Sequence, residues 1–324
     1  MNKLLFNYSD ISTYRSELMG WAIIWIMMLH FTFNQIKPLG FIAQYGFAGV
    51  EIFLFVSGFG LYFSLDNDNS TICFYKKRLI RIFPTYYLIG FFASLFIFHD
   101  NIPTYLFRYT TIGFWTRSPY WEWYIPSLVI LYIMSPFIKA MIEKHINILL
   151  SLIIPGILGI AFLFIDRESI IDREHFFFLY RIPSFIFGML CAYWMKKKNS
   201  NILFLSILLF SIPFFILLYP YHHQVYNYKY FSLIFLLPSF IISFLLISKC
   251  IKPINPIIST IGNASLEIYL IQGLFFSAII QGLIIVDAKW HDMVSILLIL
   301  ASSIMGIFVH WLIHHFRVIY NHLG

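Results

Sequence analysis

Long apolar runs separated by short polar links recur along the whole chain, and this pattern is the strongest constraint on its fold. The runs are roughly 18–25 residues long, the length that an α-helix needs to cross about 30 Å of hydrocarbon. Only 11% of the residues are charged, compared with about 25% in soluble domains, and the mean hydropathy is +0.79. The chain is therefore predicted to be an all-α, polytopic transmembrane bundle that forms one integral-membrane domain over residues 1–324.

The apolar runs predict about ten spans with both chain ends in the cytoplasm. Of the 22 Lys and Arg residues, fourteen fall on the side of the N-terminus, seven fall on the opposite side, and Arg181 lies within a span. Lys and Arg favour the cytoplasmic side, so the protein is expected to be a multi-pass protein of the cytoplasmic membrane with an uncleaved first helix. The predicted spans are residues 18–36, 44–65, 82–99, 120–140, 147–165, 176–195, 201–219, 230–248, 260–285 and 292–313.

The formal net charge of +7 is explained by these cytoplasmic anchoring links. The expected partner is therefore the lipid bilayer and not a nucleic acid. Metal binding is not expected either, because the adjacent pair His222 and His223 has a poor spacing for two ligands on one ion.

One titratable side chain, His30, lies near the outer end of the first span, in the run LMGWAIIWIMMLHFTF. A polar ring in hydrocarbon is costly and marks a candidate functional site. The following span runs in the opposite direction and places Glu51 at a similar depth, so the two side chains are predicted to touch. A carboxylate would hold the imidazole in one tautomer and raise its basicity. The alternative is a histidine that only bonds a neighbouring helix or lies at the interface.

Two further ionisable residues, Glu122 and Arg181, are expected in the outer half of the membrane, near the starts of their spans. Charges at that depth are expected to pair with one another or to line a wet cavity. A purely structural ion network is the alternative. The nearby tryptophans, including Trp115 and Trp123, are either sugar-stacking platforms or, more often, interface anchors.

A basic cluster marks the opposite, cytoplasmic face, in the segment FYKKRLIRIFP. Arg78 and Arg81 are one helical turn apart, and Lys76 and Lys77 are adjacent to them. Guanidinium pairs suit phosphate groups, although anchoring by the positive-inside rule also explains such a cluster. The two clusters together predict a phosphorylated donor in the cytoplasm whose thin arm crosses roughly 18 Å to His30.

Several ordered motifs in this chain resemble the acyltransferase 3 family of integral-membrane acyltransferases. The resemblance covers nearly the whole chain, and it depends on the order and spacing of the pieces because no single piece is specific. The pieces are ELMGWAIIWIMMLH, GVEIFLFVSGFGL, KKRLIRIFPTYY, WEWYIPSLVILYIMSPFI, RIPSFIFGML and IGNASLEIYLIQ.

The resemblance implies an O-acyltransferase that moves acetyl, or sometimes succinyl, from acyl-CoA to hydroxyls of sugars or glycans. It implies that His30 is the catalytic histidine, and we expect Glu51 to assist it. Acyl-CoA, with acetyl-CoA as the first candidate, is then a co-substrate on the cytoplasmic side, and pantetheine is the thin arm. The expected donor-binding residues are Lys76, Arg78, Arg81 and Arg15, and the expected acceptor-binding residues are Glu122, Trp123, Tyr124 and Arg181.

The chain departs from the family pattern at three positions. The arginine that often lies eleven residues before the histidine is Met19, and Arg15 serves in its place only if its side chain reaches further into the membrane. The aspartate of the second helix is Glu51, and the histidine of the late motif is Gln272.

The expected mechanism is direct transfer, with His30 as general base and with Arg181 or groups near residues 121–124 as candidate oxyanion donors. A covalent acyl-histidine relay is the mechanistic alternative. Ser57 lacks the context of a catalytic serine and is expected to be a small packing residue. Two other functions remain open, namely a transporter or exporter of a glycan or lipid-linked sugar and a non-catalytic member of the same fold.

Overall fold

The computed structural model describes residues 6–68, 70–116, 123–147, 173–197 and 226–323. Within these ranges every regular element is a helix and no strand occurs, which confirms the predicted all-α class. The helix α4 (Ala48–Asn67) lies at the centre, with α10 (Arg173–Lys196) packed along it and α2 (Arg15–Phe31) on another side.

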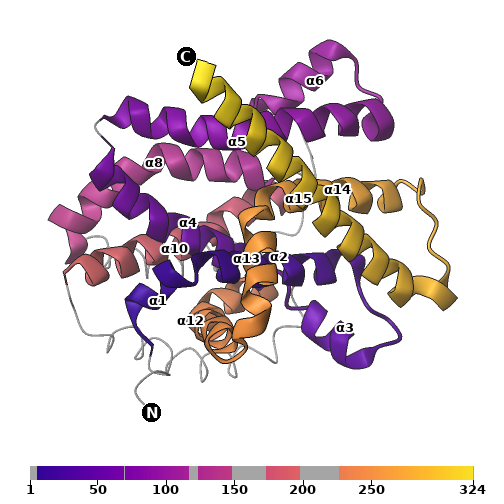
Figure 1. The fold of residues 1–324 in the computed structure, drawn as a ribbon, viewed down its shortest axis with the longest axis horizontal. Helices are drawn as coiled ribbons and strands as arrows, with labels where there is room; N and C mark the ends of the chain where they lie inside the picture. The colour runs from indigo at the N-terminus through magenta and orange to yellow at the C-terminus, as the bar shows by residue number, and fades with distance from the viewer. Residues whose placement is uncertain (1–5, 69, 117–122, 148–172, 198–225, 324) are drawn as a thin grey trace.

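The remaining helices surround this centre, and the long α15 crosses α14 on the outside of the bundle (Figure 1). They are α1 (Tyr8–Thr13), α3 (Lys37–Ala43), α5 (Thr71–Ala93), α6 (Ile102–Tyr109), α7 (Ile112–Thr116), α8 (Tyr124–Lys144), α12 (Tyr226–Cys250), α13 (Asn255–Asn263), α14 (Ser265–Ile280) and α15 (His291–Leu323). A π-helical turn, η2 (Ser94–Phe98), continues α5.

Two glycines allow α4 and α10 to approach until their backbones touch. A Cβ atom on Gly58 would lie 2.2 Å from the carbonyl oxygen of Phe185, and one on Gly188 would lie 2.0 Å from that of Phe55. Small residues let helix backbones come close where packing, and not hydrophobic exclusion of water, drives helix association. This close contact packs α10 directly against α4.

Four described helices are long and apolar enough to cross a membrane, and a fifth span results if one bent pair is counted as a unit. The four are Ala48–Asn67, Thr71–Phe98, Tyr124–Lys144 and His291–Phe316, which overlap four of the predicted spans. Of the other predicted spans, 147–165 falls almost wholly, and 201–219 wholly, outside the described residues. The total of ten spans and the cytoplasmic position of both termini stay predictions.

The predicted span 260–285 is not one straight helix. Within this range α13 ends at Asn263, and α14 runs only from Ser265 to Ile280. Before this range, the chain also bends by 95° between Leu236–Cys250 and Lys252–Asn263. Pro253 and Pro256 follow the bend, and proline cannot donate the backbone hydrogen bond that a continuous helix requires.

The third span also begins earlier than expected. Thr71 opens α5, and the side chain of Ser70 caps it by accepting from the backbone N–H of Cys73, so the basic segment is helical and not a loop. The first span ends earlier than residue 36, because Thr32 turns the chain out of α2 with a φ of 49°.

Candidate active site

Three of the four predicted donor-binding residues lie on one cavity of about 510 Å³. Arg15 comes from the start of α2, and Arg78 and Arg81 come from the first half of α5. Met19, at the position where the family often has an arginine, lines the same cavity. Arg15 therefore lies on the cavity that this position faces. Three guanidinium groups of like charge on one cavity repel each other, and a bound polyanion would relieve that repulsion. Lys76, in contrast, is exposed and is not among the lining residues.

The arginine positions follow from local contacts. Arg78 donates to the hydroxyl of Ser64, and Ser64 in turn donates to the carboxylate of Asp68 at 3.0 Å. Lys77 donates to the same carboxylate and thereby holds the pKa of Asp68 below its usual range. The link between α4 and α5 thus orients Arg78 toward the cavity.

Arg15 lies along the surface of α4 where Gly60 has no side chain. A Cβ atom there would be 3.6 Å from the Nη2 atom of Arg15, which is an ordinary van der Waals contact. The guanidinium of Arg15 therefore lies next to this turn of α4.

His30 lies on a second, smaller cavity of about 80 Å³. Its Nδ1 atom is 2.7 Å from the Oε1 atom of Gln272 on α14, and its ring is 4.8 Å from the ring of Phe276. An amide oxygen only accepts hydrogen bonds, so Nδ1 is the donor in this contact, and in the neutral ring the lone pair is then on Nε2. A neutral imidazole with a free Nε2 is the form that a general base needs.

The predicted contact between His30 and Glu51 is wrong, because each of the two side chains contacts a different partner in the structure. In the described part of the chain, Glu51 instead accepts from Arg181, with Nη1 to Oε1 at 2.6 Å, and from the hydroxyl of Ser184. Both charged side chains are about 1% exposed. Depth along a span places two residues at one level but does not say which way each faces, and here α4 turns Glu51 toward α10.

Arg181 nevertheless reaches the cavity of His30. It lines that cavity, donates to the carbonyl oxygen of Phe47 at 3.1 Å, and lies 5.1 Å from the ring of Trp123. Trp123 lines the same cavity, whereas Tyr124 lines the larger one. Glu122, the remaining predicted acceptor residue, lies outside the described residues.

Tyr269 lies between the two cavities, because it lines both of them. It is only 4% exposed, and its ring lies 5.0 Å from the ring of Tyr124. A ligand that extends from the arginines to His30 must therefore pass Tyr269. Sequence reasoning missed this residue, although it belongs to the late motif that also contains Gln272.

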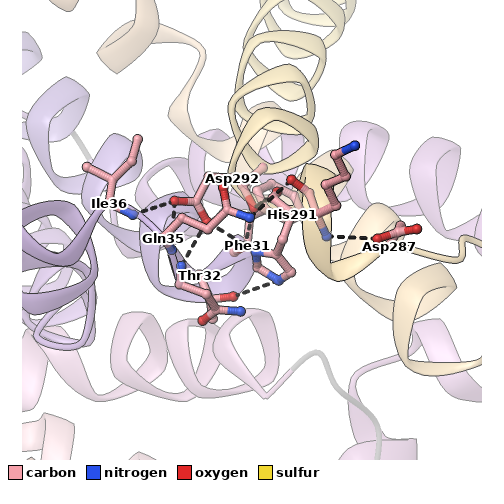
Figure 2. A network of polar contacts seen from close by, with 10 residues as sticks. Phe31, Thr32, Gln35, Ile36, Asp287, His291 and Asp292 are labelled. Atoms are coloured by element: carbon pink, nitrogen blue, oxygen red, sulfur yellow. Dashed lines mark hydrogen bonds and ion pairs between the residues drawn. The ribbon is translucent and has the colours of Figure 1, made fainter.

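The C-terminal end of the helix that carries His30 is held by α15 (Figure 2). The carboxylate of Asp292 accepts from the backbone amides of Asn34, Gln35 and Ile36 at 2.8, 3.0 and 2.7 Å. Ser295 donates to the carbonyl oxygen of Phe31 at 2.5 Å. These contacts fix the chain directly after His30.

Comparison with known proteins agrees with this geometry. A model of the acyltransferase 3 family, described as an acyltransferase domain, matches residues 18–315. The match covers nearly the whole chain, and the chain therefore belongs to this family of acyltransferases.

One curated relative comes from Acidianus two-tailed virus and is named "Putative acetyltransferase ORF330". It is 28% identical over 199 residues, which is 58% of this chain and 59% of the relative. No solved structure matches the chain significantly.

Proposed function

We propose that this protein transfers an acetyl or other short acyl group from acyl-CoA to a hydroxyl of a sugar or cell-surface glycan. The observation that carries the proposal is the position of His30. Its Nδ1 contacts Gln272, and its cavity shares the wall residue Tyr269 with a cavity lined by three arginines. The protein is further proposed to act in the cytoplasmic membrane, with the donor entering from the cytoplasm.

The arginine cavity suits the phosphates of the donor, since guanidinium groups bind phosphate through paired hydrogen bonds. Pantetheine then extends past Tyr269 and brings the thioester to His30.

In the proposed reaction, Nε2 of His30 takes the proton from the acceptor hydroxyl as its oxygen attacks the thioester carbonyl. The new C–O bond forms, the C–S bond breaks, and the CoA sulfur leaves and takes the proton from His30. Arg181 lines the same cavity, so its guanidinium is the candidate to stabilise the oxyanion. Glu51 supports this step only through Arg181.

Replacing His30 by Ala tests the enzyme against the transporter. We expect acyl groups on the glycan to disappear while the protein level and the amount of surface glycan stay normal. If the glycan no longer reaches the surface but keeps its acyl content per sugar, the protein exports glycan instead. If neither changes, the protein is a non-catalytic member of the family.

Incubating the wild-type protein with labelled acetyl-CoA and no acceptor distinguishes direct transfer from a covalent acyl-histidine relay. Label that stays on His30 supports an acyl-histidine intermediate, whereas an unlabelled protein under single-turnover conditions supports direct transfer.

A further inference from the structure

The cavity beside His30 is small, and its size bears on which acyl group reaches the histidine. Its volume of about 80 Å³ is close to half of the roughly 150 Å³ that holds a benzene molecule. A space of this size suits about three non-hydrogen atoms, which is the size of an acetyl group. A succinyl or butyryl group is larger and would extend into the opening that the acceptor needs.

The wall of this cavity is mostly apolar. Ile26, Leu29 and Val50 contribute aliphatic side chains, and Phe276 contributes an aromatic ring at 4.8 Å from the ring of His30. Of these, Phe276 is the largest side chain, and it lies on α14 one turn beyond Gln272. Its ring packs against the imidazole and therefore limits the space beside His30.

We propose that Phe276 is a specificity-determining residue that restricts the transferred acyl group to the size of acetyl. This inference rests on the proposed function. Longer acyl-CoA donors occupy the arginine cavity equally well, because their nucleotide and pantetheine are unchanged. Their acyl carbon, however, does not reach His30 in a reactive position. The selection thus acts on the reaction of the bound donor and not on its binding.

The proposal is tested with the full-length protein in lipid bilayers and with acetyl-, propionyl-, butyryl- and succinyl-CoA as donors. The measured quantity is label transferred to envelope glycan from cells that lack the protein. A single methylene in a close-fitting apolar pocket is worth roughly 10-fold or more in rate. We expect wild-type protein to prefer acetyl over butyryl by at least about that factor.

Phe276→Ala removes the ring, and we expect the acetyl-to-butyryl ratio to fall by roughly 10-fold. Phe276→Leu is a milder change that keeps the side chain apolar, and an intermediate ratio is expected. Phe275→Ala is the matched control, because it removes the same ring from the same helix at a position that does not line the cavity. The ratio is measured within one sample, so partial loss of folded protein does not change it.

The outcomes separate the inference from the function on which it depends. If wild-type protein transfers nothing from any donor, the proposed function itself is overturned. If wild-type protein uses all four donors equally, or if both Phe276 variants keep the wild-type ratio, the role of Phe276 is overturned while acyl transfer stands. A changed ratio in Phe275→Ala as large as in Phe276→Ala also overturns it.

Discussion

The Nδ1 atom of His30 lies 2.7 Å from the Oε1 atom of Gln272, although 242 residues separate them in the chain. Gln272 is buried, with 1% of its surface exposed. This contact assigns the proton to Nδ1 and turns Nε2 into the basic atom. Gln272 thus has the orienting role that the sequence had suggested for Glu51.

Gln272→Ala removes this orientation, and we expect kcat to fall by roughly 10-fold to 100-fold with little change in the KM for acyl-CoA. Gln272→His restores a ring nitrogen at the position and is expected to recover part of the activity with a changed pH profile. Gln281→Ala, at an exposed position at the end of the same helix, is the control. A rise in KM alone would contradict the orienting role.

Each arginine of the larger cavity is expected to hold donor phosphates. A hydrogen bond to a charged group is worth about 1.5–3 kcal/mol, so Arg15→Ala, Arg78→Ala or Arg81→Ala should raise the KM for acyl-CoA by roughly 10-fold to 100-fold. The wild-type KM should also rise with ionic strength.

Lys76→Ala serves as the control for these three variants, because Lys76 is exposed on the same helix and does not line the cavity. An effect of Lys76→Ala equal to that of Arg78→Ala would mean that surface charge in general, and not this cavity, attracts the donor.

The buried pair of Glu51 and Arg181 is expected to matter for stability as well as for the site. Removing one partner leaves a buried charge without compensation, at a cost of roughly 3–5 kcal/mol. Arg181→Met alone should therefore lower the thermal stability of the purified protein more than Glu51→Gln combined with Arg181→Met. Equal loss in the single and double variants would show that the pair itself contributes little.

Asp292 is expected to act on His30 from a distance, by holding residues 34–36 (Figure 2). Asp292→Ala frees the C-terminal end of α2. If His30 acts as proposed, we expect kcat to fall by roughly 10-fold to 100-fold, because a small displacement of a catalytic group is costly. Asp287→Ala is the control, since Asp287 accepts from the backbone of Lys289 and does not contact the α2 end. Unchanged activity in Asp292→Ala would mean that α2 needs no support there.

The sequence was informative where a pattern repeats over a whole helix or where a residue type is costly. Apolar run length predicted the helical class and the approximate position of α4, α8 and α15. The cost of an imidazole in hydrocarbon singled out His30, and helical spacing placed Arg78 and Arg81 together. The ordered motifs also identified the family, which the match over residues 18–315 confirms.

The partners of the charged and polar side chains were decided only by the tertiary structure. Apolar periodicity gives the depth of a residue in a span, but rotation of the helix about its axis sets which neighbour it faces. The close packing of α4 and α10 at Gly58 and Gly188 accompanies the pairing of Glu51 with Arg181, and the packing of α14 on α2 brings Gln272 to His30. The two cavities that share Tyr269 also depend on helix packing. Each is lined by residues far apart in the chain, which only the tertiary structure brings together.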